Sequence, residues 1–314
     1  MPVDSVLADA DNADTMAHDS TPLRFVLVPK VAHPWYEEVH RGAREQAQFL
    51  EKQTGRKIVV EHRPPSVAGV AEQDAMLAAV LATAPAGIAL DPVDTLAHLP
   101  ALAVARQRSI PVLVFDAPSS NPNVCSVGND FAEQGAMAAR RLVQRIGGSG
   151  KVAVMQGVPT APNHRERHRA QLRVLQEHPA ITVVDGGTDN DDIPTAKQQA
   201  AAVLAAHQDL VGYLCCDASG PIGIAAAIRE AGRVGKVTFV SMDGIEPILR
   251  EVKAGVIDAS AATIPDLQGS MALLMLWQAS QGMRIPQKID TGIDLITADN
   301  VDRFLAAVRG PAPR

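Results

Sequence analysis

The chain has 314 residues, of which 46% are hydrophobic and 20% are charged, and its formal net charge is −6. This amount of apolar material can form a large buried core and favours two domains, which excludes a fibrous or disordered protein. A net acidic chain lacks the concentrated Lys and Arg that binding to a phosphate backbone requires, so no nucleic-acid partner is expected. The sequence contains no uninterrupted apolar run of transmembrane length.

The first 23 residues are rich in Asp, Ala, Ser and Thr and lack the basic and then apolar pattern of an export leader. This composition predicts a flexible N-terminal segment outside the fold. The missing leader leaves two alternatives open: the protein is not exported, or a leader was removed ahead of this segment.

From Arg24 onward, short β-branched or apolar runs alternate with helix-length amphipathic stretches, which is typical of repeated βαβ units and a mostly parallel sheet. After the first strand, a stripe of apolar residues at three- and four-residue spacing predicts a helix that packs on a sheet. The predicted strands are residues 25–28, 58–61, 87–90, 112–115, 124–127, 152–155, 182–184, 212–214, 238–240 and 257–261.

Two strands in different halves of the chain end in the same way. Residues 112–115 lead into Asp116, and residues 239–242 lead into Asp243. Open α/β sheets place their ligand crevice beyond the carboxyl ends of their strands. The sequence therefore predicts an α/β protein with two similar doubly wound lobes whose crevices face each other as one cleft.

An ordered series of motifs resembles the type I periplasmic sugar-binding proteins, the ribose-binding-like solute-binding components of ABC transporters. The resemblance covers about residues 24–304. It is carried by His33-Pro34-Trp35-Tyr36, Phe115-Asp116, Gly128-Asn129-Asp130, Arg165-Glu166-Arg167, Cys216-Asp217, Met242-Asp243-Gly244 and Thr291-Gly292-Ile293-Asp294.

The resemblance implies a hinge with three crossovers between discontinuous lobes. Lobe 1 would comprise residues 24–128 plus 264–291, and lobe 2 residues 129–263 plus 292–314. It also implies a periplasmic monomer that closes on a small polyhydroxylated ligand and delivers that ligand to a membrane permease.

We expect Trp35 to stack on the apolar face of a sugar or polyol beside Tyr36, although simple core packing would also explain this aromatic pair. Asp116, Asp243 and Arg165 would form hydrogen bonds with ligand hydroxyls. The alternatives are a helix cap or a turn for each aspartate, and a surface salt bridge with Glu166 for Arg165.

The resemblance places further residues at the site. His33 and Cys216 stand where ribose binders have Asn, and Thr263 stands where Gln is usual. Asn190 replaces a stacking Phe, which suggests one aromatic wall only and favours an open-chain polyol or a different pentose. The lining is completed by Asn129, Asp130, Asp217 and Met242, although Asx residues at strand ends are commonly turn formers.

Three other functions are alternatives to an uptake protein. A sensor that feeds a receptor would use the same cleft, whereas a DNA-binding regulator would need a recognition helix for which the first 23 residues leave no room. A carbohydrate-active enzyme would need Asp116 and Asp243 in opposite protonation states. No cofactor or metal is expected, because the three cysteines lack metal-ligand spacing and the pair His164 and His168 stands among arginines.

Overall fold

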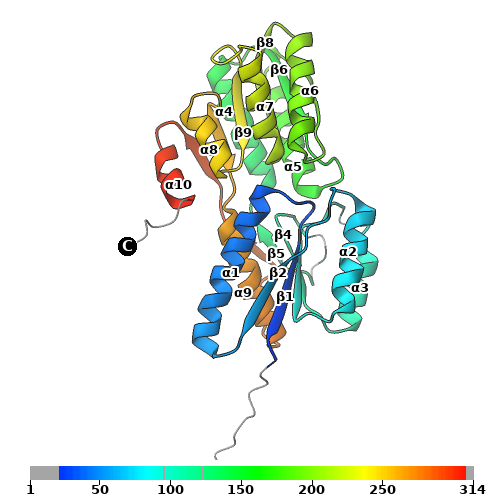
Figure 1. The fold of residues 1–314 in the computed structure, drawn as a ribbon. Coiled ribbons are helices and arrows are strands. Elements are labelled where there is room, and N and C mark those ends of the chain that lie inside the picture. Colours follow the sequence, from blue (N-terminus) through cyan, green and yellow to red (C-terminus); the bar gives the residue numbers. More distant parts are fainter. Residues whose placement is uncertain (1–20, 95, 120, 122, 309–314) are drawn as a thin grey trace, which may run out of the picture.

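The computed structural model describes residues 21–94, 96–119, 121 and 123–308, so residues 1–20 of the predicted flexible segment lie outside it. Two lobes, each a six-stranded sheet with helices on its faces, are stacked along the long axis of the molecule (Figure 1). The predicted α/β fold with two doubly wound lobes is confirmed. None of the helices within the described residues combines the length and apolar character needed to cross a bilayer.

The first lobe is built on a wholly parallel sheet with the strand order β11-β5-β4-β3-β1-β2. The sequence predicts Leu23 as the last residue of the flexible segment, but the structure shows it as the buried first residue of β1. The elements are β1 (Leu23–Val28), α1 (Pro34–Thr54), β2 (Ile58–His62), α2 (Val70–Ala82), β3 (Gly87–Leu90), α3 (Leu99–Gln107), β4 (Val112–Phe115), β5 (Ser126–Gly128), α9 (Pro265–Ser280) and β11 (Lys288–Asp290).

The second lobe has the strand order β12-β10-β9-β8-β6-β7, and only β12 runs antiparallel to its neighbour. Its elements are α4 (Phe131–Ile146), β6 (Gly150–Gln156), α5 (Pro162–Gln176), β7 (Ile181–Thr188), α6 (Ile193–Ala206), β8 (Leu210–Leu214), α7 (Ser219–Glu230), β9 (Thr238–Met242), α8 (Glu246–Lys253), β10 (Ala259–Ala262), β12 (Asp294–Thr297) and α10 (Val301–Val308).

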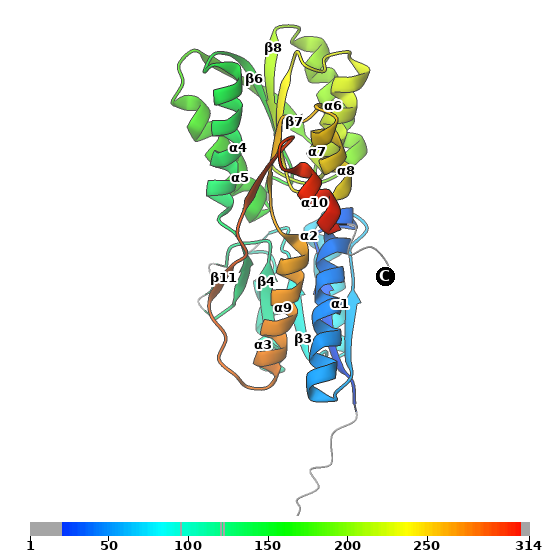
Figure 2. The same ribbon diagram turned by 90° about the vertical axis from the view of Figure 1, so that its left-hand side faces the viewer.

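The chain passes between the two sheets three times, after β5, after β10 and between β11 and β12. Figure 2 shows the last passage as a long segment that runs from β11 into the other lobe. Neither β11 nor β12 was predicted as a strand. Both are short and lack a buried apolar run, because each lies at the edge of its sheet.

Helices α1 and α9 lie side by side on one face of the first sheet (Figure 2). Two glycines allow this close approach: a methyl group on Gly42 would lie 1.9 Å from the carbonyl oxygen of Asp266, and one on Gly269 would lie 1.8 Å from that of Val39. The resulting contact holds α9, which follows the second crossover, against the helix that begins at the cleft.

The strand-end aspartates Asp116 and Asp243 both have left-handed backbones, with φ of 44° and 67°. Asp tolerates this region better than most residues with a side chain. The sharp turn ends each strand and leaves the carboxylate at the edge that faces the other lobe.

Candidate functional site

Side chains from both lobes surround a small cavity between the carboxyl ends of the two sheets. Its volume is about 10 Å³, and its lining consists of Lys30, His33, Trp35, Tyr36, Asp116, His164, Arg167, Asp191, Ala218 and Asp243. Such a space holds about one water molecule. Five of the predicted site residues are therefore brought together here, namely His33, Trp35, Tyr36, Asp116 and Asp243.

The carboxylate of Asp116, at the end of β4 in the first lobe, is bound by two side chains of α5 in the second. Arg167 Nη2 donates to Oδ1 at 3.0 Å, and Asn163 Nδ2 donates to Oδ2 at 2.6 Å. Burial alone would lower the pKa of Arg167, but the attraction of Asp116 and Asp243 outweighs it and raises that pKa. Asp116 thus joins the lobes through a buried, charged hydrogen-bond network.

The sequence predicts that Arg165 contributes to the site, but the arginine that lines the cavity is Arg167. Two residues along an α-helix turn the side chain by about 200°, so the two arginines point to opposite faces of α5. Arg167 is 1% exposed and shares the buried face with Ala170 and Val174, whereas Arg165 is half-buried outside the cavity. The apolar spacing of this helix is the signal that would have selected Arg167.

A second link between the lobes runs through Trp35 at the start of α1. Its indole Nε1 donates to Thr263 Oγ1 at 3.0 Å, and the Thr263 hydroxyl donates to Asp243 Oδ1 at 2.5 Å. Burial raises the pKa of Asp243, against the opposing effect of Arg167. Thr263 therefore supports two cavity-lining side chains without lining the cavity itself.

Lys30 and Asp91 form a buried ion pair that was not predicted. Lys30 Nζ donates to Asp91 Oδ2 at 2.5 Å, and the Tyr36 hydroxyl donates to the same oxygen at 2.7 Å. Burial alone would lower the pKa of Lys30, but the nearby aspartates outweigh it and raise that pKa. Burial also raises the pKa of Asp91, to about 7. Because Lys30 and Asp91 follow β1 and β3, the rule that selected Asp116 would also have found them.

His33 and His164 bring two imidazoles to the cavity. His33 caps α1, because its Nδ1 accepts from Trp35 N at 3.1 Å, and His164 Nδ1 accepts from Val158 N at 3.0 Å. Burial lowers both pKa values, that of His164 strongly. Both rings are therefore neutral at pH 7, and the Nε2 of His33 has no hydrogen-bond partner among the described residues.

Asn190 is exposed and lies outside this cavity, which is lined instead by the next residue, Asp191. Both residues have left-handed backbones, with φ of 55° and 61°. The Asp191 carboxylate accepts from the Ser219 hydroxyl at 3.2 Å. Asn190 instead lines a neighbouring pocket of about 380 Å³ together with His33 and Asp191, so its role in binding stays a prediction.

Four other predicted residues lie behind the cavity wall, in contact with protein groups. Asn129 Nδ2 donates to Gln134, and the thiol of Cys216 donates to Gln156 at 2.9 Å. Met242 belongs to the apolar core of the second lobe. Asp217 accepts from Gly220 N at 3.0 Å and is fully buried.

Asp217 lies against another carboxylate that was not predicted, that of Asp189 at the end of β7. Burial, reinforced by the charge of Asp217, raises the pKa of Asp189 to about 11. Burial and the charge of Asp191 raise the pKa of Asp217 to about 7, although its hydrogen bond with Asp189 opposes this shift. Like charges this close cannot both be ionised, so the pair shares a proton at neutral pH.

Comparison with known proteins identifies the family. A family model described as a periplasmic binding protein domain matches residues 25–283. This chain belongs to that family. The predicted resemblance to type I periplasmic sugar-binding proteins is thereby confirmed.

Two curated relatives of this periplasmic binding protein match about two thirds of it. The ribose import binding protein RbsB of Haemophilus influenzae is 25% identical over 198 residues, which cover 63% of this chain and 67% of the relative. The xylitol-binding protein of Mycolicibacterium smegmatis is 26% identical over 205 residues, which cover 65% of this chain and only 58% of the relative.

A solved structure extends the similarity to nearly the whole periplasmic binding protein. It is an ABC transporter solute-binding protein from Burkholderia graminis C4D1M in complex with D-arabinose. The two are 25% identical with a TM-score of 0.83, over 90% of this chain and 97% of the other.

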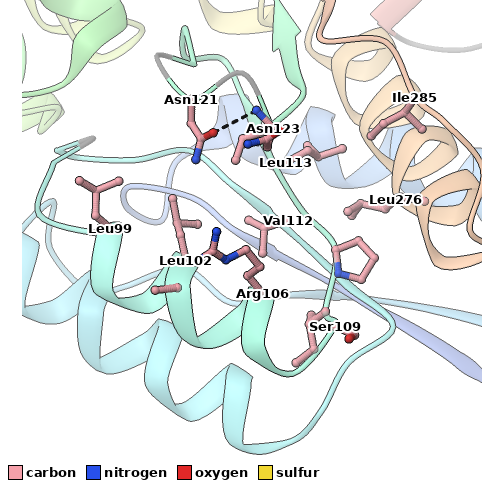
Figure 3. A pocket seen from close by; sticks show the side chains of 15 residues that line it. Leu99, Leu102, Arg106, Ser109, Val112, Leu113, Asn121, Asn123, Leu276 and Ile285 are labelled. Carbon is pink, nitrogen blue, oxygen red and sulfur yellow. Dashed lines mark hydrogen bonds between the residues drawn. The ribbon is translucent and has the colours of Figure 1, made fainter.

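A larger groove of about 560 Å³ lies elsewhere on the first lobe of this binding protein, between α3 and α9. Figure 3 shows that mostly apolar side chains line it, with Arg106 as the single charged group among the described lining residues. A polyhydroxylated ligand needs several converging donors and acceptors. The interlobe cavity, although smaller, provides them and is therefore the better candidate site.

Proposed function

We propose that this periplasmic binding protein captures a monosaccharide or sugar alcohol between its lobes and is the solute-binding component of an ABC transporter. The observation that carries the proposal is the Asp116 network, because Arg167 and Asn163 of the second lobe occupy both oxygens of a first-lobe carboxylate. The same charged donors and acceptors are suited to ligand hydroxyls, which both donate and accept hydrogen bonds.

The charge balance of the cavity favours an uncharged ligand. Asp116 is paired with Arg167, and Asp91 with Lys30. The two remaining carboxylates, those of Asp243 and Asp191, accept hydrogen bonds from neutral hydroxyl groups. A neutral polyol can insert into these pairs without leaving a buried charge uncompensated. The indole of Trp35 offers an apolar face for the C–H groups of the same ligand.

The size of the cavity requires that the lobes move. A volume of about 10 Å³ excludes a monosaccharide, so the ligand must enter an open form and be enclosed by hinge closure. We propose that closure replaces the direct contacts between lobes by contacts through the ligand, and that a permease recognises the closed form. This mechanism needs no bond to be made or broken, so we propose a binding protein without enzymatic activity, monomeric and periplasmic.

The relatives support the same ligand class. The names of two of them refer to ribose import and xylitol binding, and the structural neighbour holds D-arabinose. The resemblance places Asn190 where ribose binders have a stacking Phe, so we propose a pentose other than ribose, or a pentitol.

The experiment begins with a thermal-shift screen against pentoses, hexoses, tetritols and pentitols, because a ligand bound only by the folded state raises the melting temperature. Calorimetric titration with the active compound then compares Arg167→Gln with Arg165→Gln. We expect about a 10- to 100-fold loss of affinity for Arg167→Gln, as for a lost charged hydrogen bond, and less than about 3-fold for Arg165→Gln, which lies outside the cavity. A shift by amino acids or nucleotides alone, or a loss confined to Arg165→Gln, would contradict the proposal.

A further inference from the structure

Two histidines and a glutamate form a cluster on the first lobe, outside the ligand cavity. Glu37 and His40 lie one turn apart on α1, and His62 is the last residue of β2. Each offers one ligand atom, and the three atoms lie within 4.8 Å of one another. The cluster joins two elements that are far apart in sequence, so no linear spacing motif reveals it.

His62 is held in this cluster with one nitrogen unsatisfied. Its side chain is 9% exposed, and its Nδ1 lies 3.4 Å from Glu37 Oε1. Its Nε2 is buried and has no hydrogen-bond partner among the described residues. The rings of His40 and His62 stack with their centroids 5.1 Å apart. A buried polar atom without a partner is unfavourable unless something else satisfies it.

We propose that Glu37, His40 and His62 form a binding site for a divalent transition-metal ion such as Zn²⁺. Imidazole and carboxylate ligands suit such ions, and three protein ligands leave a further coordination position for water. Tetrahedral zinc with bonds of about 2.0–2.1 Å brings its ligand atoms to about 3.3 Å from one another. The Glu37 side chain is 64% exposed and is free to rotate over the remaining distance.

The charges around the cluster are compatible with a cation. The guanidinium of Arg63, next to His62, donates twice to Glu61, at 2.9 and 2.7 Å. Arg41, next to His40, donates to Glu38 and Glu45. The two neighbouring positive charges are thus each paired with a carboxylate.

A bound ion would link the first turn of α1, which carries Trp35 and Tyr36 into the ligand cavity, to the edge strand β2. Because the three ligands come together only in the folded chain, metal binding stabilises the folded state by mass action. The proposed capture of a ligand between the lobes does not depend on this metal site.

The test is calorimetric titration of the tag-free, chelator-treated full chain with ZnCl₂, together with melting curves. We expect one equivalent to bind and the melting temperature to rise. His40→Gln and His62→Gln should each weaken binding by at least about 10-fold, since loss of outer partners of metal ligands alone costs 10- to 100-fold. His207→Gln, in the second lobe, is the matched control and should change neither result.

Absence of stoichiometric zinc binding to the unaltered chain would overturn the proposal, as would unchanged affinity in the two histidine variants. If His62→Gln fails to fold, Glu37→Gln replaces it, because that side chain is exposed and its loss leaves packing intact. Equal zinc affinity of Glu37→Gln and the unaltered chain would then remove the glutamate from the site and refute the three-ligand cluster.

Discussion

The Thr263 hydroxyl is predicted to stabilise the folded chain through its two hydrogen bonds between Trp35 and Asp243, and Thr263→Val tests this with almost no change of shape. The variant removes the acceptor of the Trp35 indole, at 3.0 Å, and the donor to Asp243, at 2.5 Å. A neutral hydrogen bond contributes about 1 kcal/mol and one to a charged group about 1.5–3 kcal/mol. Because both partners stay buried, we expect Thr263→Val to lower the free energy of unfolding by about 2–4 kcal/mol.

Urea denaturation followed by tryptophan fluorescence measures this loss, since Trp35 is one of only two tryptophans in the chain. Thr263→Ser is the matched control: it keeps the hydroxyl and removes one methyl group, so its cost should stay near 1 kcal/mol. Equal stabilities of the Val and Ser variants, within about 0.5 kcal/mol, would refute the assignment of these two hydrogen bonds.

Two further predictions concern the buried carboxylates and the helix contact. The pKa of Asp189 is raised to about 11, so between pH 7 and 8.5 the folded chain keeps a proton that the unfolded chain, with a pKa near 3.9, has lost. The free energy of unfolding should therefore fall by up to about 2 kcal/mol between pH 7 and 8.5. Asp189→Asn should remove this pH dependence, which is measured by urea denaturation at each pH. Gly42→Ala places a methyl group against the Asp266 carbonyl, so it should lower the melting temperature by an amount that corresponds to about 1–3 kcal/mol of unfolding free energy. The control Arg44→Ala, on the exposed side of α1, should leave the melting temperature unchanged. Equal melting temperatures of the two variants would show that α1 and α9 can separate without cost.

The fold was predictable because its strongest signals are local. Central parallel strands such as β3 and β4 are short apolar runs bounded by turns, and the predicted bounds of these two agree with the structure. β11 and β12 were missed, because an edge strand buries little and is defined by pairing with a partner far away in the sequence. The crossovers that these strands complete were expected only from the resemblance.

The site was predictable only in part, because strand ends are visible in a sequence while side-chain directions are not. Asp116 follows an apolar strand directly, and the structure places it in the cavity. Lys30 follows a strand by the same rule and was overlooked. The choice between Arg165 and Arg167 depended on which face of α5 is buried, and the stripe that continues through Val174 contains that information. The roles of Asp116, Lys30 and Arg167 in ligand binding remain predictions.

The distribution of charge in the cavity indicates which carboxylate is most available to a ligand. Asp91 and Asp116 are held by ion pairs, and Asp189 and Asp217 share a proton behind the wall. Asp191, in contrast, accepts from one hydroxyl donor at 3.2 Å, which is longer than the hydrogen bonds to Asp116 and Asp243. A ligand hydroxyl that donates to Asp191 would displace little, whereas one that donates to Asp116 must compete with Arg167. Binding strength on the second lobe is therefore expected to depend on Asp191, one residue after the Asn190 that the resemblance indicated.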